Sequence, residues 1–179
     1  MAGAGMKDIK RRIKSVESTM QITKAMELVS SSKLRRAKEK VEKSRPYFNI
    51  LQETIQKVLD NTKSLKSVYT KEREIKNSLY IVIAGDRGLA GGYNPNIIKA
   101  AVAEMEGKNP KIIPIGRKAS EYFGKRNYEV VEDYVNVAES LDFIDAALIT
   151  SVADEMYRDG KVDEVYLCYT EFVSALTQT

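Results

Sequence analysis

The stretch GDRGLAGGYN, residues 85–94, is the part of the sequence that most resembles a ligand site. It follows the apolar run SLYIVIA, and a glycine-rich loop after a strand is typical of a phosphate cradle, because glycine lets backbone N–H groups approach the ligand. Dinucleotide loops have the spacing G-x-G-x-x-G, whereas these glycines lie at positions 85, 88, 91 and 92. A P-loop requires lysine and then serine or threonine after its last glycine, and here Tyr93 and Asn94 follow. Neither phosphate-binding fingerprint fits.

Two interpretations of this loop stay open. In the first, its glycines supply the positive φ angles of a compact turn, and Asn94 and Pro95 begin the next helix as its N-cap and first residue. In the second, Asp86 and Arg87 are exposed at the strand tip and contact a partner or a ligand. The sequence offers no general acid and base, metal cluster or activated nucleophile around the loop, so an enzyme site is not supported there.

The composition removes several kinds of chemistry. The 179 residues include no histidine and one cysteine, Cys168, so zinc, haem iron and a histidine-assisted nucleophile lack their usual side chains. A disulfide within the chain is excluded, which suits a reducing, cytosolic compartment. Cys168 lies in an apolar run and is expected in the core. We therefore expect no cofactor and no metal.

The elements that position the loop predict an α/β fold for residues 78–179. The expected strands are Leu79–Ala84, Lys111–Ile115, an edge strand in Tyr128–Val135 and a buried strand in Val165–Val173, and the expected helices are Asn96–Glu106, Arg117–Arg126 and Asp142–Arg158. Strands that alternate with helices form a mainly parallel sheet covered by helices. The sequence therefore predicts a Rossmann-like domain.

Residues 1–60 predict one very long helix. No glycine occurs between Lys7 and Asp60, and the single proline, Pro46, is expected to bend the helix, because helical spacing resumes beyond it. Apolar residues recur at spacings of three, four and seven, at Ile9, Ile13, Val16, Met20, Ile22, Met26, Val29, Leu34, Ala37, Val41, Phe48, Leu51, Ile55 and Val58. About fifty residues at roughly 1.5 Å each make a rod of about 80 Å, so this apolar stripe needs another helix as its partner.

The other side of the expected helix is strongly basic. Residues 1–76 hold 19 Lys and Arg against 9 Asp and Glu, a net charge of +10, and residues 77–179 carry −6. Such a face is commonly only solvated, but it also occurs in proteins that bind nucleic acid or anionic membranes. Aromatic residues between the basic ones and a known nucleic-acid module are both missing from the sequence.

The two parts are joined by residues 61–77, NTKSLKSVYTKEREIKN, which lose the helical periodicity and are highly charged, as is typical of a linker. The longest apolar run, Leu79–Ala84, is too short to span a bilayer, and the start MAGAGMKDIKRR lacks the apolar segment of a signal peptide. We expect no direct insertion of this chain into a membrane.

Four stretches of the sequence are informative as a set: MAGAGMKDIKRRIKSVESTMQITKAMELVSSSKLRRA, SRPY, DRGLAGGYN and IGRKASEYF. Together they closely resemble the gamma subunit family of bacterial F-type ATP synthases, over residues 1–179. The resemblance implies the central shaft of a rotary motor, a non-catalytic subunit that transmits rotation between the membrane ion-translocating ring and the catalytic ring of alpha and beta subunits. In that family the N-terminal and C-terminal helices form an antiparallel coiled coil, and a Rossmann-like domain packs at its foot.

The resemblance also implies partners and contact residues. The residues that match the family segment facing the levers of the beta subunits are Ile22, Thr23, Lys24, Ala25, Met26 and Glu27, with Arg35 and Arg36 just beyond. A basic shaft is attracted to acidic levers at long range and in any register. Asp86 and Arg87 are further candidates for partner contact. The implied partners include the epsilon subunit and the membrane rotor ring but no nucleic acid, and the implied location is peripheral, at the cytoplasmic face of the bacterial cell membrane.

The resemblance leaves one alternative and one difference. The family's central domain is not known as a nucleotide site, which favours a structural role for the glycine loop. The alternative hypothesis is a Rossmann-type nucleotide-binding enzyme. Family members continue beyond this chain with the C-terminal helix that completes the coiled coil. We therefore expect the stripe from Ile9 to Val29 to lack its partner in this chain and to self-associate.

Overall fold

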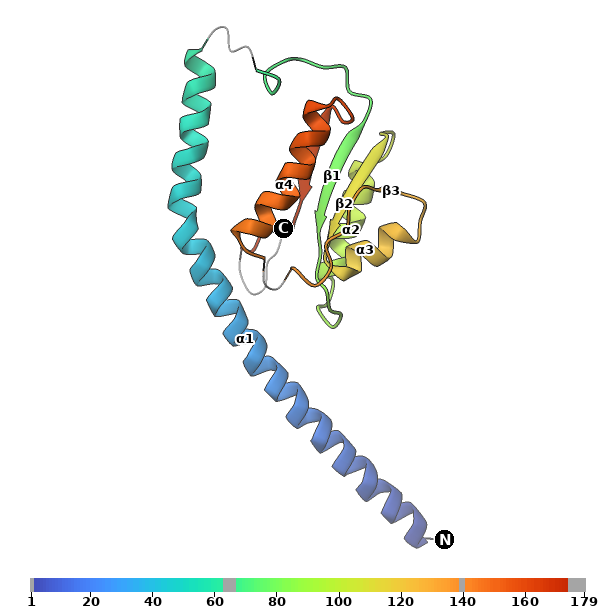
Figure 1. Ribbon diagram of the computed structural model, residues 1–179. Coiled ribbons are helices and arrows are strands. Elements are labelled where there is room, and N and C mark those ends of the chain that lie inside the picture. Colours follow the sequence, from blue (N-terminus) through green and yellow to red (C-terminus); the bar gives the residue numbers. More distant parts are fainter. Residues whose placement is uncertain (1, 63–66, 139–140, 174–179) are drawn as a thin grey trace. The chain divides into compact units, whose positions relative to one another are not determined.

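The computed structural model describes residues 2–62, 67–138 and 141–173, with side chains from residue 5 onward. The chain divides into two compact units, Met1–Leu65 and Lys66–Thr179. The first unit is a single helix, α1 (Ala2–Asn61), 60 residues long (Figure 1). α1 continues through Pro46, because one proline removes one hydrogen bond from a long ladder whose spacing resumes on both sides. The predicted long N-terminal helix is confirmed.

The second unit is built on a four-stranded sheet. Its strands are β1 (Ser78–Ile83), β2 (Pro110–Ile115), β3 (Glu129–Val130) and β4 (Glu164–Cys168), in the order β3-β2-β1-β4. All three strand pairs are parallel, and Tyr80 in β1 lies between Ile112 in β2 and Tyr166 in β4. The predicted mainly parallel sheet is confirmed, as is an edge strand within residues 128–135.

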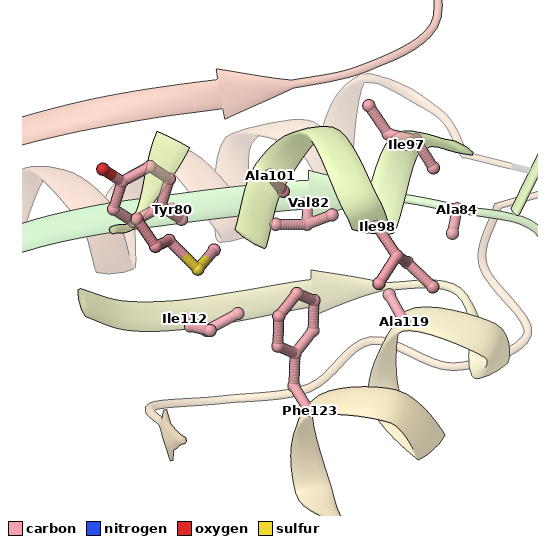
Figure 2. Packing of buried hydrophobic residues seen from close by; sticks show 10 residues of the cluster. Tyr80, Val82, Ala84, Ile97, Ile98, Ala101, Ile112, Ala119 and Phe123 are labelled. Atoms are coloured by element: carbon pink, nitrogen blue, oxygen red, sulfur yellow. The ribbon is translucent and has the colours of Figure 1, made fainter. Parts of the chain in front are cut away.

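Helices cover both faces of this sheet (Figure 1). α2 (Tyr93–Glu104) and α3 (Arg117–Gly124) pack on one face, and α4 (Phe143–Arg158) packs on the other. β1 alternates between the two layers, because successive side chains of a strand point to opposite faces. Tyr80 and Val82 meet α2 and α3 (Figure 2). Leu79 and Ile81 meet α4 on the other face.

Two helix starts show how local sequence fixes the boundaries. Asp142 caps α4: its carboxylate accepts hydrogen bonds from the N–H groups of Ile144 and Asp145, and the carboxylate of Asp145 accepts one from the N–H of Asp142. This reciprocal capping box agrees with the helix expected from Asp142 to Arg158. α2 begins three residues earlier than expected, with Gly92 as its N-cap. The prediction that Asn94 is the N-cap is therefore wrong.

The predicted strand within residues 165–173 is present as β4, but the prediction that it is buried and reaches Val173 is wrong. β4 ends at Cys168 and lies at the edge of the described sheet, with Val165 and Leu167 exposed. Val165 and Leu167 are paired with Leu79 and Ile81 of β1, on the face of the sheet that α4 covers. The buried residues of α4 pack on β1 and β2, which leaves Val165 and Leu167 exposed. An apolar run alone does not distinguish a central strand from an edge strand. Cys168 is half-buried and packs against the core on the α2 side, and this burial raises the pKa of its thiol.

The segment expected as a charged linker is partly attached to the second unit. Residues 63–66 lie outside the described part of the chain, but Tyr69, Arg73 and the N–H groups of Lys76 and Asn77 make hydrogen bonds to α4 and the turn after it. Among the described residues, no helix is both long and apolar enough to cross a bilayer.

Candidate functional site

The apolar stripe of α1 is exposed to solvent along its whole length. Of the predicted contact residues, Ile22 and Met26 are 59% and 51% exposed. The other large apolar side chains of the stripe are exposed to a similar degree, from Ile9 and Ile13 near the start to Val58 near the end. Burying one such side chain contributes about 1.5–3 kcal/mol. The stripe is therefore a large surface that another protein segment can stabilise by covering it.

The predicted contact residues of α1 divide into faces according to their spacing. Ile22 and Met26 are four residues apart and share one face of the helix, whereas Lys24 points to nearly the opposite side, at about 100° per residue. Arg35 lies eleven residues, about three turns, beyond Lys24 and shares its side. Lys24 and Arg35 thus lie on the side of the helix away from Ile22 and Met26.

Two of the predicted contact residues, Thr23 and Arg35, make contacts within α1. Thr23 donates from Oγ1 to the carbonyl oxygen of Thr19 at 2.9 Å. Arg35 lies 3.8 Å from the carboxylate of Glu39, with both side chains mostly exposed. Exposed pairs of this kind are worth a few tenths of a kcal/mol, so they leave the side chains available to a partner. Glu27 and Arg36 are exposed as well.

The glycine loop is held together by the buried side-chain amide of Asn94. The side-chain oxygen of Asn94 accepts the N–H of Gly85 at 2.7 Å, and its side-chain nitrogen donates to the carbonyl of Arg87 at 3.0 Å. Asn94 lies in the first turn of α2, and its buried side chain fills the inside of the glycine loop. Of the four loop glycines, Gly91 alone has a positive φ angle, 55°, and the other positive φ angle of the turn, 58°, belongs to Leu89. The prediction that the glycines supply the positive φ angles therefore holds for Gly91 and is wrong for Gly85, Gly88 and Gly92.

Asp86 is not exposed in the way that the sequence suggests. It is half-buried, and its Oδ1 accepts the N–H of Arg117 at 2.9 Å and the N–H of Asn136 at 2.7 Å. Its Oδ2 is buried and has no hydrogen-bond partner among the described residues. Asp86 thus joins three loops, whereas its neighbour Arg87 is exposed. Partner contact by these two residues stays a prediction.

Sequence reasoning missed the residue that this loop displays most openly. Leu89 is 96% exposed at the tip of the loop, although it is a large apolar residue in a left-handed conformation. Backbone conformations of this kind cost energy and are concentrated in functional loops. A leucine between Gly88 and Gly91 was the available signal, because an apolar residue inside a glycine-rich turn has no strand or helix to bury it.

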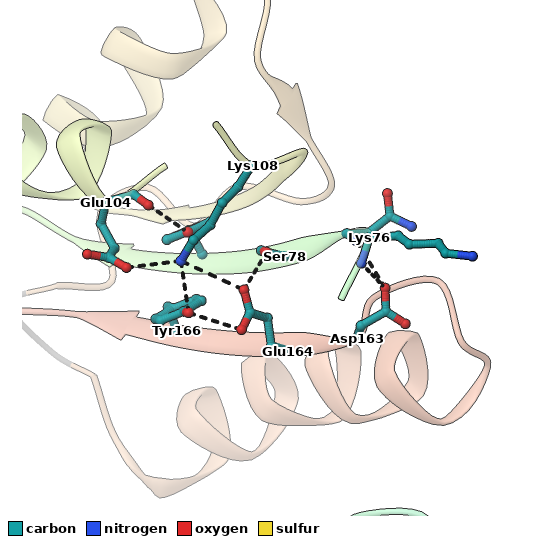
Figure 3. Close-up of polar contacts among 9 residues, drawn as sticks. Lys76, Ser78, Glu104, Lys108, Asp163, Glu164 and Tyr166 are labelled. Carbon is teal, nitrogen blue, oxygen red and sulfur yellow. Dashed lines mark hydrogen bonds and ion pairs between the residues drawn. The ribbon is translucent and has the colours of Figure 1, made fainter. Parts of the chain in front are cut away.

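A second polar cluster, around Lys108, lies at the opposite edge of the sheet, where β1 and β4 begin (Figure 3). Lys108 donates from Nζ to Glu104 and to the hydroxyl of Tyr166, both at 2.9 Å. The hydrogen bond to Tyr166, followed by that to Glu104, raises the pKa of Lys108. The ring of Tyr166 stacks on Tyr80 with centroids 4.9 Å apart. The cluster ties the end of α2 to the edge strand β4, and the sequence analysis did not identify it.

Comparison with known proteins identifies the family. The sequence model described as ATP synthase matches residues 5–179. The ATP synthase gamma chain of Alkaliphilus metalliredigens is 51% identical over 176 residues, which are 98% of this chain and 61% of that protein. The chain belongs to the ATP synthase gamma chain family. A sodium-ion-specific ATP synthase gamma chain from Acetobacterium woodii is 42% identical over 174 residues, 97% of this chain and 58% of that protein.

Other gamma chains support the assignment, and a solved structure supports the fold. The gamma chain of Ruminococcus albus is 47% identical over 180 residues, 98% of this chain and 63% of that protein. This chain therefore spans about three fifths of the length of these gamma chains. The structure of the central stalk and c-ring of the Tetrahymena thermophila mitochondrial ATP synthase matches with a TM-score of 0.69 at 24% identity, over 88% of this chain and 69% of that one.

Proposed function

We propose that this chain forms part of the central shaft of a rotary ATP synthase. Residues 1–60 supply one helix of an antiparallel coiled coil inside the ring of alpha and beta subunits, and residues 78–179 form the domain at its foot. The shaft transmits rotation between the catalytic ring and the membrane ion-translocating ring, and it carries no catalytic residue of its own. Its place is peripheral, at the cytoplasmic face of the bacterial membrane.

One observation carries this proposal: a 60-residue helix exposes an apolar stripe along its entire length in a chain of the gamma family. An amphipathic helix in a globular protein buries its apolar face against its own core. A helix whose apolar face is not buried in its own chain needs another helix or another subunit to cover that face. The named relatives are gamma chains of ATP synthases, and the solved relative is a central stalk.

The basic side of α1 supports contact with the catalytic ring. Lys24 and Arg35 project from the side opposite Ile22, and the first 76 residues have a net charge of +10. A cationic shaft attracts acidic lever loops at long range and without one fixed register, so each lever in turn can engage the rotating shaft. Contact of the α/β domain with the epsilon subunit and the rotor ring is part of the same proposal.

Reconstitution tests the proposal. Residues 1–179 are joined to the remaining C-terminal part of the Alkaliphilus metalliredigens gamma chain, and this extended chain is mixed with alpha and beta subunits of that organism. We expect the extended chain to restore ATPase activity and to rotate within the ring. An assembled complex with no ATPase activity above that of alpha and beta subunits alone refutes the proposal.

Matched variants of the extended chain test the contact residues. Met26→Ala and Lys24→Gln are compared with Met6→Ala and Lys57→Gln, which change exposed residues of the same helix outside the predicted contact segment. We expect the first pair to lower coupling between hydrolysis and rotation at unchanged thermal stability. Equal effects of both pairs contradict the assignment of these two contact residues.

A further inference from the structure

The segment that leads from α1 to the sheet is fixed by side chains rather than by secondary structure. Residues 67–77 contain one turn and no helix or strand, and their apolar members Val68 and Ile75 are exposed. Neither a backbone ladder nor a hydrophobic core therefore explains why this segment is ordered. Three of its contacts lead to the last turns of α4 and the turn that follows, and at its end the side chain of Asn77 also accepts a hydrogen bond from Asn109 at 2.6 Å.

The first fixed point is Tyr69. Its hydroxyl donates to the carboxylate of Asp154 at 2.5 Å, and its ring stacks on that of Tyr157 with centroids 5.9 Å apart. The hydrogen bond to Asp154 raises the pKa of Tyr69. Asp154 and Tyr157 flank the buried side chains of Ala153 and Met156, through which α4 is packed against the sheet. Tyr69 is thus attached to a rigid part of the domain.

The second and third fixed points follow along the chain. Arg73 donates from Nη1 to the carbonyl of Tyr157 at 2.7 Å, and its guanidinium lies 4.0 Å from the centre of the Tyr157 ring. Asp163 accepts the N–H groups of Lys76 and Asn77, both at 2.9 Å (Figure 3). The three points hold the whole length from residue 69 to residue 77.

We propose that Tyr69 and Arg73 form a clasp on the C-terminal end of α4 and are positioning residues for the transmission of force between α1 and the α/β domain. The inference rests on the proposed function, because only a chain that carries torque needs this connection to be short. If residues 62–76 were free, a fully extended tether of roughly 50 Å would have to tighten before force passed along it. With Tyr69 attached, the seven residues 62–68 separate the end of α1 from the first fixed point, and seven residues span roughly 25 Å at most.

The first test asks whether the clasp holds the segment in the chain as it exists. Hydrogen exchange is compared between residues 1–179 and the double variant Tyr69→Phe, Arg73→Gln. We expect exchange in residues 67–77 to rise at least tenfold, with β1 and β2 unchanged. Unchanged exchange in this segment overturns the proposal.

The control pair is provided by the same domain. Arg126 lies 3.8 Å from the centre of the Tyr122 ring and donates to the carbonyl of Tyr122. Arg73 makes the same two contacts with Tyr157, but Arg126 and Tyr122 both lie at the end of α3. Tyr169 is exposed to a similar degree as Tyr69. The double variant Tyr169→Phe, Arg126→Gln therefore removes the same chemical groups without opening the clasp.

The second test measures coupling in the extended chain reconstituted with its catalytic ring and membrane rotor. Ions pumped per ATP and the torque at stall are recorded for the unmodified chain, the clasp variant and the control variant. We expect the clasp variant to keep its ATPase rate without load but to lose at least half of its stall torque, while the control is unaffected. If residues 67–77 of the clasp variant exchange hydrogen freely and the variant still couples ion pumping fully to ATP hydrolysis, the clasp proposal is overturned and the proposed function is not. An unmodified extended chain that is uncoupled overturns the proposed function and the clasp together.

Discussion

Among the described glycines, Gly116 leaves the least room for a side chain. It follows β2 as the N-cap of α3, with φ 92° and ψ 142°, in a region that is essentially restricted to glycine. A Cβ atom built on it would lie 2.1 Å from the carbonyl oxygen of Ala84 and 2.8 Å from its carbonyl carbon. Both contacts are with backbone at the end of β1, which cannot rotate away as a side chain can.

The cost of Gly116→Ala follows from these two facts. The backbone conformation alone costs an alanine about 1–3 kcal/mol. Relieving the overlap requires the ends of β1 and β2 to separate, which weakens the hydrogen bond from the N–H of Ala84 to Ile115 and that from the N–H of Gly116 to Tyr134. Each such bond contributes about 1 kcal/mol. We therefore expect a loss of about 3–5 kcal/mol, a large part of the 5–15 kcal/mol typical of a domain.

Substitutions at two other glycines separate the cost of backbone strain from the cost of the overlap with Ala84. Gly107 has φ 76° but nothing within 4 Å of its added Cβ, so Gly107→Ala should cost only the conformational strain, about 1 kcal/mol. Gly124 ends α3 with open space around it and no positive φ, so Gly124→Ala should be neutral or stabilising by roughly 0.5 kcal/mol.

Urea denaturation followed by tyrosine fluorescence measures the three losses. The chain has no tryptophan, and of its ten tyrosines only Tyr47 precedes residue 66, so the signal reports on the α/β unit. A loss for Gly116→Ala no greater than that for Gly107→Ala would refute the argument, because the backbone of Ala84 would then have moved aside at no cost.

Three further predictions concern the loop, the attached segment and the stripe. Asp86→Ala should destabilise the domain by about 2 kcal/mol in urea denaturation, because two N–H groups lose their acceptor. Arg87→Ala should cost less, because Arg87 is exposed, and the reverse order contradicts the structure. Hydrogen bonds from the N–H groups of Asn77 and Lys76 lower the pKa of Asp163, so the stability that it contributes is present above about pH 4 and is lost as the pH falls through the folded pKa. An NMR titration with a midpoint at or above about 3.9 would disprove this. Residues 1–179 should sediment as a dimer or larger, and Ile13→Glu with Met20→Glu should yield a monomer; a clean monomer without these changes rejects self-association through the stripe.

The helices and the central strands were predictable because their periodicity is local. Leu79 and Ile81 alternate with Tyr80 and Val82, and both sets are buried because helices cover both faces of the sheet. The single helix from the N-terminus was predictable from spacing and from the absence of glycine. Patterns of this kind depend on neighbours within a few residues, which a sequence displays directly.

The polar contacts of the domain were not predictable in the same way. Asp86 bonds to the N–H groups of Arg117 and Asn136, 31 and 50 residues away, so nothing beside it in the sequence indicates its role. Asn94 has the side chain of an N-cap, but it turns back to Gly85 and leaves the cap to Gly92. In each case a common local preference gives way to a contact that exists only after the chain has folded.

The two units differ in what makes them stable, and this difference bears on function. The α/β unit buries two continuous cores, one on each face of its sheet. α1 has exposed pairs such as Lys38 with Glu42, each worth about 0.3–0.5 kcal/mol, and an apolar stripe that is open to solvent. Most helical stability in proteins comes from packing of the apolar face. The rigidity that a shaft needs must therefore be supplied by the protein segment that covers the apolar stripe of α1. We expect the helix to melt at a higher temperature in the extended chain than in residues 1–179 alone, as measured by circular dichroism during heating.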